Sequence, residues 1–109
     1  MNPNTMTVEQ CRDWLAVDIQ HQTLASLGSK ARSEDYYAEP DPIGATLDAA
    51  AAAMPEGWRF LRMEESETGA WNAWAGDKFG RHAKSFADTE LHCRFRLAVA
   101  CRMAMKEKA

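Results

Sequence analysis

The sequence lacks the closely spaced cysteines and histidines from which metal sites and disulfide frameworks are built. Its three cysteines, Cys11, Cys93 and Cys101, are an odd number and form no C-x-x-C pair, which argues against a disulfide framework and against a zinc ribbon. The three histidines are scattered as widely. Because metal ligands normally come at short spacings, we expect no metal site and no cofactor, and we interpret the cysteines as reduced, partly buried thiols.

Long apolar runs and targeting segments are missing as well. The longest apolar run, around residues 49–54, is far shorter than the roughly 20 residues needed to span a membrane. The first residues, MNPNTMTVEQ, contain neither the basic nor the apolar part of a secretory signal, so a cytoplasmic location is the default expectation. A length of 109 residues, with 46% hydrophobic and 27% charged residues, predicts one globular domain over residues 1–109.

Catalytic motifs are also absent. His92 and Cys93 are neighbours on a predicted helix and diverge by about 100° around its axis, which is poor geometry for a nucleophile and its base. The acids Glu64, Glu65 and Glu67 lie in a predicted hairpin turn, where charged side chains are ordinarily solvated. No glycine-rich phosphate-binding loop is present. We therefore predict that the protein is not an enzyme.

A helix and a long loop are predicted at the start of the chain. Thr7 and Gln10 have the spacing of a capping box, and apolar residues then recur at three- and four-residue intervals. This pattern predicts a helix over residues 7–24. Residues 26–41 are mostly polar and show no periodicity, so we expect a long connection there that is either mobile or in contact with a partner.

The core of the domain is predicted over residues 42–106. Asp41 as N-cap and Pro42 in the first turn predict a second helix, which the segment MPEGW ends. The segments WRFLRME and AWNAWA alternate with a period of two and predict an antiparallel hairpin, and HAKSF is a candidate third strand. Asp88 is the predicted N-cap of the last helix, on which apolar residues form one stripe from Leu91 to Met103.

These elements predict an α+β fold in the order α-α-β-β-(β)-α. We expect a two-layer sandwich in which the helices pack on one face of a small antiparallel meander of two or three strands.

Two tryptophans indicate a binding surface. In a strand, Trp71 and Trp74 face opposite sides of the sheet, and helices normally cover only one side of so small a sheet. One of the two rings then lies on a face that still has apolar surface to bury. Either the loop around Tyr36 and Tyr37, or the first helix, covers that face, or the face binds a partner protein or a second copy of the chain. These two tryptophans and two tyrosines are the candidate partner-binding residues.

Charge is unevenly divided along the chain, whose net charge is −3. Residues 1–54 carry eight acids and three bases, whereas residues 77–108 carry eight bases and four acids. The second segment is suited to hold phosphates, as in a nucleic-acid-binding module. The alternative is the solvated face of an amphipathic helix, because two of its arginines lie about 200° apart around the helix axis. The candidate nucleic-acid-binding residues are Lys78, Arg81, Lys84, Arg94 and Arg96.

Two segments, PIGATLDAAAAAMPEGWRF and ADTELHCRFRLAVACRMA, carry a family resemblance. Over about residues 42–106 the chain resembles a group of small phage and prophage proteins described as the phage alpha-beta-alpha sandwich domain. The resemblance implies a phage origin and a two-layer fold, and it supplies no catalytic residues. We therefore expect a non-enzymatic phage or prophage accessory protein that binds a host protein stoichiometrically, for example as an anti-CRISPR-like inhibitor of a host defence system. The alternatives are a nucleic-acid-binding module and a structural homodimer.

Overall fold

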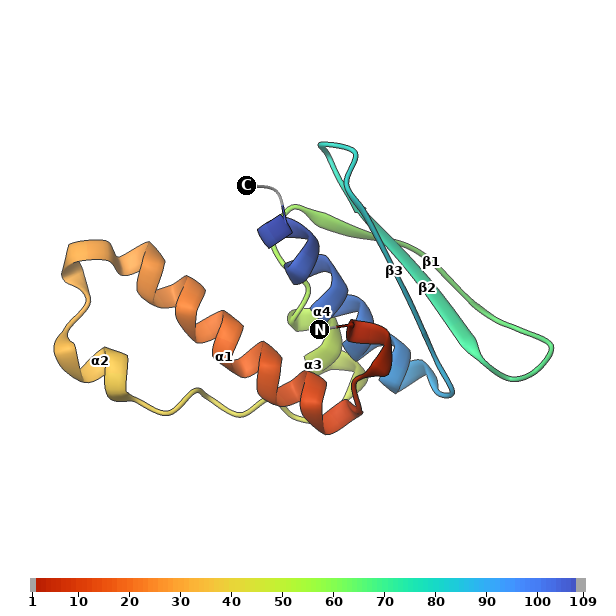
Figure 1. Ribbon diagram of the computed structural model, residues 1–109, viewed down its shortest axis with the longest axis horizontal. Coiled ribbons are helices and arrows are strands. Elements are labelled where there is room, and N and C mark those ends of the chain that lie inside the picture. The colour runs from red at the N-terminus through yellow and green to blue at the C-terminus, as the bar shows by residue number, and fades with distance from the viewer. Residues whose placement is uncertain (1, 108–109) are drawn as a thin grey trace.

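The computed structural model describes residues 2–107 of the chain (Figure 1). The elements follow one another in the predicted order, with helices first, then three strands and then a helix, so the predicted α+β class is confirmed. They are the 3-10 helix η1 (Pro3–Thr5), α1 (Val8–Leu27), the 3-10 helix η2 (Gly28–Lys30), α2 (Ser33–Tyr37), α3 (Leu47–Ala52), β1 (Trp58–Glu65), β2 (Trp71–Asp77), β3 (His82–Ala87) and α4 (Glu90–Glu107).

The three strands form an antiparallel meander in the order β1-β2-β3. The hairpin predicted from the two alternating segments is present, and the candidate third strand is confirmed as β3. The register of β1 on β2 shifts between Phe60 and Arg62, which makes Leu61 the extra residue of a β-bulge. Because side chains alternate along a strand, this register decides which of them share a face.

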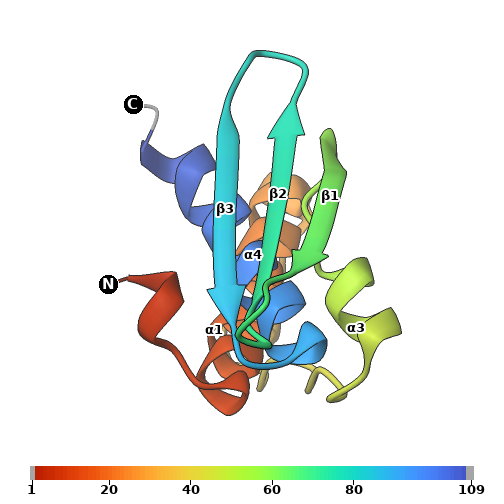
Figure 2. The same ribbon diagram turned by 90° about the vertical axis from the view of Figure 1, so that its right-hand side faces the viewer.

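Helix α4 lies at the centre of the core because it is apolar on two sides. The side facing the sheet carries Cys93, Leu97 and Cys101, which pack with the buried alanines of β2 and β3. The other side carries Phe95 and Val99, which pack with residues of α1 and α3. In Figure 2 the sheet lies in front of α1 and α4. The single apolar stripe predicted for this helix is therefore one of two.

Helix α1 begins as the sequence predicts. The Thr7 side chain accepts a hydrogen bond from the Gln10 backbone, and the Gln10 side chain accepts one from the Thr7 backbone, which completes the capping box. The helix continues beyond residue 24 to Leu27, and Gly28, with φ of 56°, follows it. Its last turns extend away from the sheet (Figure 1).

The long loop predicted over residues 26–41 is partly wrong. Its first residues complete α1, and η2 and α2 follow. Helix α2 forms because Asp35 accepts a hydrogen bond from the Arg32 backbone, and because acids in a first turn interact favourably with the helix dipole. A capped helix of five residues is too short for apolar periodicity to reveal it.

Two predicted helix caps are also wrong. Helix α3 begins at Leu47, five residues after Pro42, and its N-cap is Thr46 in place of Asp41. The Thr46 hydroxyl accepts a hydrogen bond from the Ala49 backbone at 3.0 Å. Helix α4 is capped by Thr89 in place of Asp88, because the Thr89 hydroxyl accepts from the His92 backbone at 3.1 Å. In both cases a threonine hydroxyl meets the third backbone N–H of the helix, which is the bond that an N-cap makes.

A buried ion-pair network ties α1 to α4. The Asp18 carboxylate lies 3.2 Å from the Arg102 guanidinium and 2.5 Å from the Lys106 amine. Arg102 also donates to the Gln22 side chain at 2.6 Å and to the Ala53 carbonyl at 2.8 Å. The network therefore satisfies a buried charge and fixes the end of α3 against the two long helices. Within residues 2–107, no helix combines the length and apolar content required to cross a membrane.

Candidate binding face on the open side of the sheet

The two tryptophans of β2 lie on opposite faces of the sheet, as predicted. Trp71 is partly buried and packs against the cluster beneath α4. Trp74 lies on the other face, which we call the open face, opposite Arg62 of β1 and Lys84 of β3. Trp74 is therefore the ring that the core leaves outside, and Trp71 is not part of the same surface.

Strand register places further side chains on the open face. On one side of the central row, Arg59 and His82 lie opposite Gly76. A side chain added at Gly76 would meet His82 at 3.2 Å and Leu61 at 3.4 Å, which shows that both side chains lie over this glycine. This end of the open face adjoins the β2–β3 turn.

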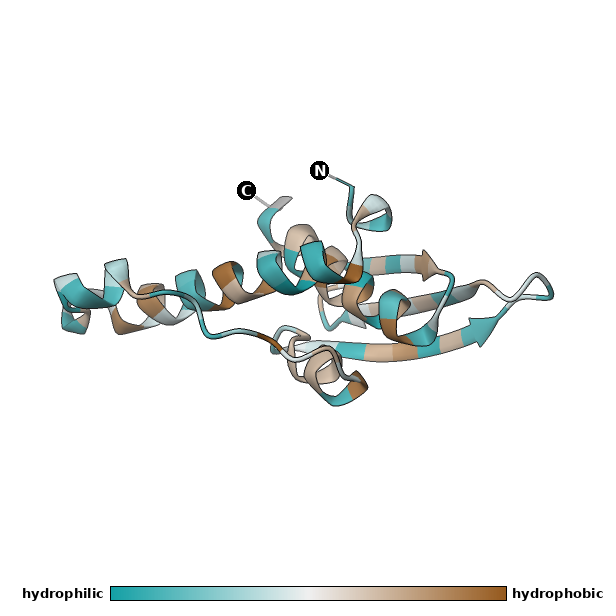
Figure 3. Cartoon of the chain, turned by 90° about the horizontal axis from the view of Figure 1, so that it is seen from below, coloured by the Kyte–Doolittle hydropathy of each residue, from teal (hydrophilic) through white to brown (hydrophobic). Residues whose placement is uncertain are grey.

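The other end of the open face adjoins the β1–β2 turn. There Glu64 and Phe86 lie opposite Asn72. Phe86 keeps 50% of its surface exposed, and Leu61, in the bulge, keeps 49%. Figure 3 shows the alternation of polar and apolar residues along the strands. The open face is thus a surface on which exposed apolar side chains lie among charged ones.

Neither of the covers considered from the sequence lies on this face. Helix α1 packs on α4, which separates it from the sheet. Tyr36 and Tyr37 are exposed in α2, at the end of the molecule away from the sheet (Figure 1). Figure 2 shows the open face toward the viewer, and no helix of residues 2–107 crosses it. The two tyrosines and Trp74 therefore belong to separate surfaces.

The centre of the open face is Trp74, over whose ring two cations lie. The Arg62 guanidinium lies 4.2 Å from the centre of the Trp74 ring, and the Lys84 amine lies 5.2 Å from it. Such cation–π contacts are worth roughly 0.5–1 kcal/mol at exposed sites. Among the described side chains, none of the ion pairs involves Arg59, Arg62 or Lys84. These three positive charges are therefore available to a partner.

The predicted basic patch over residues 77–108 does not form as one surface. Arg94 and Arg96 lie on α4, where Arg94 is 3.6 Å from Glu90 and Arg96 donates to the carbonyls of Met6 and Phe86. In contrast, Lys84 belongs to the open face. The predicted set is split because α4 and the open face lie on opposite sides of the sheet.

The β2–β3 turn holds the other two residues of the predicted set. Lys78 is exposed there, while Arg81 is paired with Asp77, its Nε lying 2.5 Å from the carboxylate. Desolvation acts to raise the pKa of Asp77, but the hydrogen bonds from the Arg81 and Phe79 backbones and from the Arg81 side chain lower it overall. Arg81 therefore closes the turn, and Lys78 lines a hollow with Trp58 and Met105 on the helix side of the sheet, so neither residue belongs to the open face.

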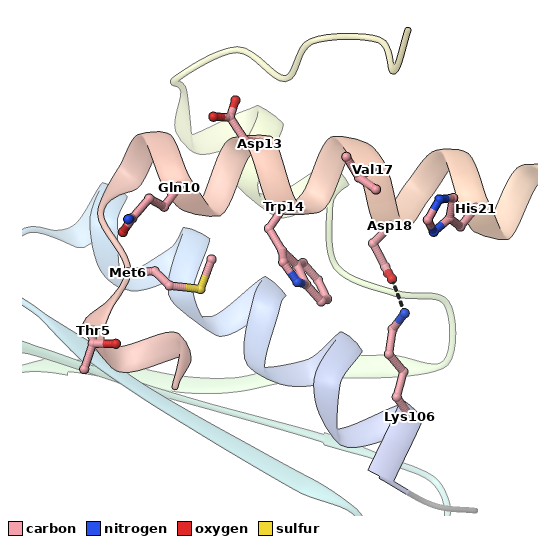
Figure 4. A pocket seen from close by; sticks show the side chains of 9 residues that line it. All are labelled: Thr5, Met6, Gln10, Asp13, Trp14, Val17, Asp18, His21 and Lys106. Carbon is pink, nitrogen blue, oxygen red and sulfur yellow. Dashed lines mark ion pairs between the residues drawn. The ribbon is translucent and has the colours of Figure 1, made fainter. Parts of the chain in front are cut away.

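Apart from the open face, a hollow with a volume of about 620 Å³ lies between α1, η1 and the end of α4 (Figure 4). Trp14 lies in it with Lys106, whose amine is 5.7 Å from the ring centre. Asp18 already bonds Arg102 and Lys106. The hollow therefore offers an apolar wall and two carboxylates, of which Asp18 is paired with cations and Asp13 is exposed.

The buried thiols are poor nucleophiles. Burial raises the pKa of Cys11 to about 11 and that of Cys101 to about 12. Burial also raises the pKa of Cys93, against the lowering effect of the Ser85 hydroxyl, which lies 3.3 Å from the Cys93 sulfur. The thiolate is the reactive form of cysteine, and a raised pKa disfavours it. These free, buried cysteines therefore serve as packing groups. No group of three or more metal-ligating side chains occurs in the described part of the chain.

Comparisons with known proteins identify no relative of this chain. No family model, curated protein or solved structure matches the chain. The resemblance to phage alpha-beta-alpha sandwich domains, and with it the phage origin, stays a prediction.

Arg59, Arg62 and Phe86 are site residues that the sequence analysis did not single out. The signal that identifies them is strand register, because each lies on the same face as Trp74 once the turns are fixed. Their positions follow from the turn lengths and from the bulge at Leu61.

Proposed function

We propose that the protein acts by stoichiometric binding of a negatively charged macromolecule through the open face. One observation carries this proposal. Arg62 and Lys84 lie over the Trp74 ring on a sheet surface that no helix of the described residues 2–107 crosses. Tryptophan and arginine are common anchors of binding sites, and unpaired cations favour an anionic partner by electrostatic steering.

The proposal is of binding without catalysis. Two histidines lie near the open face or α4, yet His92 bonds the Met6 carbonyl at 2.7 Å and His82 is exposed beside Gly76. Among the described residues, neither histidine forms a hydrogen bond with a nucleophilic side chain. Turnover of a nucleotide or peptide substrate that depended on His82 or His92 would overturn this part. A phage origin and a role against a host defence complex remain predictions of the resemblance.

The test measures binding to a panel of polyanions: heparin, polyglutamate and oligothymidylate. We expect saturable one-to-one binding of at least one of them by calorimetry at about 50 mM salt, and loss of that binding in the double variant Arg62→Ala, Lys84→Ala. The control removes two exposed cations far from the sheet, Lys30 and Arg32, and should leave binding unchanged. Absence of binding to all three, or equal weakening in the control, would refute the proposal.

A further inference from the structure

The open face has the parts that a surface for single-stranded nucleic acid requires. Such surfaces combine aromatic side chains on which bases stack with cations that follow the phosphates. Here Trp74 and Phe86 supply the rings, and Arg59, Arg62 and Lys84 supply the cations. We propose that the open face binds single-stranded nucleic acid. This inference rests on the binding role proposed above and names its partner.

The two rings are placed for neighbouring bases. Phe86 lies two residues from Lys84, the cross-strand partner of Trp74, so the two rings are diagonal neighbours on one face. Residues in that relation are about 7–8 Å apart, roughly twice the 3.4 Å between stacked bases of one strand. Two consecutive bases that are separated from each other therefore fit over the two rings. The Arg62 guanidinium lies over the Trp74 ring, so a base at this position would stack on the guanidinium plane or take its place on the ring.

The charges give the surface a direction. The end beside the β2–β3 turn carries Arg59, whereas the end beside the β1–β2 turn carries Glu64. Phosphates should therefore lie across the central row and toward the β2–β3 turn. The net charge of −3 does not oppose this placement strongly, because the eight acids of residues 1–54 lie in or between α1, α2 and α3, and α1 and α3 pack on α4 and not on the open face.

The geometry favours a single strand over two other anionic partners. A duplex offers phosphates, but its bases are stacked on one another and their flat surfaces cannot reach Trp74 and Phe86. An acidic protein surface offers negative charge but no series of planar groups. Its carboxylates would contact Arg62 and Lys84, and nothing in it would stack on the two rings. Both partners are separate outcomes of the test.

The test is fluorescence anisotropy of labelled oligothymidylate, ~20 nucleotides long, against duplex DNA of equal length and labelled polyglutamate. We expect binding of the single strand that is tighter than that of the duplex and that weakens as salt is raised. Trp74→Ala should lower the affinity by about 5- to 150-fold, the range found for loss of one stacked base. Lys84→Ala should reduce the slope of log affinity against log salt by about 0.7.

Matched controls separate binding from folding. Tyr37→Ala removes a ring that is 88% exposed on α2, away from the sheet, and should leave the affinity unchanged. Phe86→Ala removes the second ring of the open face and should weaken binding even if Trp74→Ala fails to fold. Circular dichroism and the unfolding midpoint of each variant show that the fold is retained.

Four outcomes would overturn the inference. Binding of polyglutamate without binding of the single strand would indicate an acidic protein partner, and the proposed function would stand while this inference failed. Duplex binding as tight as single-strand binding would show that phosphates alone are recognised. Binding of the single strand that is unaffected by Trp74→Ala and Phe86→Ala would place the site elsewhere. Absence of binding to heparin as well would refute both proposals together.

Discussion

Replacing Asp18 by asparagine should destabilise the protein strongly. The Asp18 side chain is 3% exposed and the Arg102 side chain 6% exposed, so the change leaves a buried guanidinium without its counter-charge. Breaking a buried pair in this way costs about 3–5 kcal/mol. Arg102 keeps its bonds to Gln22 and Ala53, so we expect the lower end, about 3 kcal/mol, and a Tm about 10 °C lower.

Urea unfolding followed by tryptophan fluorescence and circular dichroism measures this loss. Asp13→Asn is the matched control, because Asp13 lies on the same helix and is exposed, and it should be neutral. In the double variant Asp18→Leu, Arg102→Met the stability should recover in large part, since apolar replacement of a buried pair is often close to neutral. A loss below about 1 kcal/mol for Asp18→Asn would show that water compensates the guanidinium, and would refute the reasoning.

Three further outcomes are expected. Thr89→Ala should lower the free energy of unfolding by about 1 kcal/mol, because it removes the N-cap of α4, while Asp88→Ala should change it little; equal losses in urea unfolding would contradict the assignment of the cap. The three buried thiols should resist a thiol reagent at about pH 8 in the native protein and react fully in denaturant, so rapid native reaction would count against their burial. Because the folded-state pKa of Asp77 is lowered from 3.8, its interactions stabilise the fold above that value and are lost as the pH falls through the lower folded pKa. Asp77→Asn should therefore be less stable than the wild type at about pH 7 and approach it near pH 2, and a gap that stays constant with pH would argue against the carboxylate.

Local signals in the sequence predict most of the fold. The capping box of Thr7 and Gln10 fixes the start of α1, and the alternation of apolar residues identifies β1 and β2. These signals work because each depends on residues only a few positions apart. The caps at Thr46 and Thr89 were missed since an acid stands close before each of them, at Asp41 and Asp88, and local pattern does not decide between two residues that both make good caps.

The site depends on contacts that are distant in sequence. That Trp74 lies outside and Trp71 inside follows from α4, whose second apolar side packs beneath Trp71. The grouping of Arg62 with Lys84 follows from register across two turns. Periodicity within one strand shows neither which tryptophan faces the core nor which residues lie opposite Trp74. The sequence analysis could therefore name Trp74 as a candidate without naming its neighbours.

The central place of α4 has a consequence for synthesis of the chain. Both buried clusters include residues of this helix, and α4 follows every other described element along the chain. While the ribosome is still making the strands, α1 and the sheet each expose an apolar surface that has no counterpart yet. Both clusters can therefore pack only after α4 has been synthesised. If synthesis stops before residue 90, the partly made chain exposes apolar surface of the kind that chaperones bind.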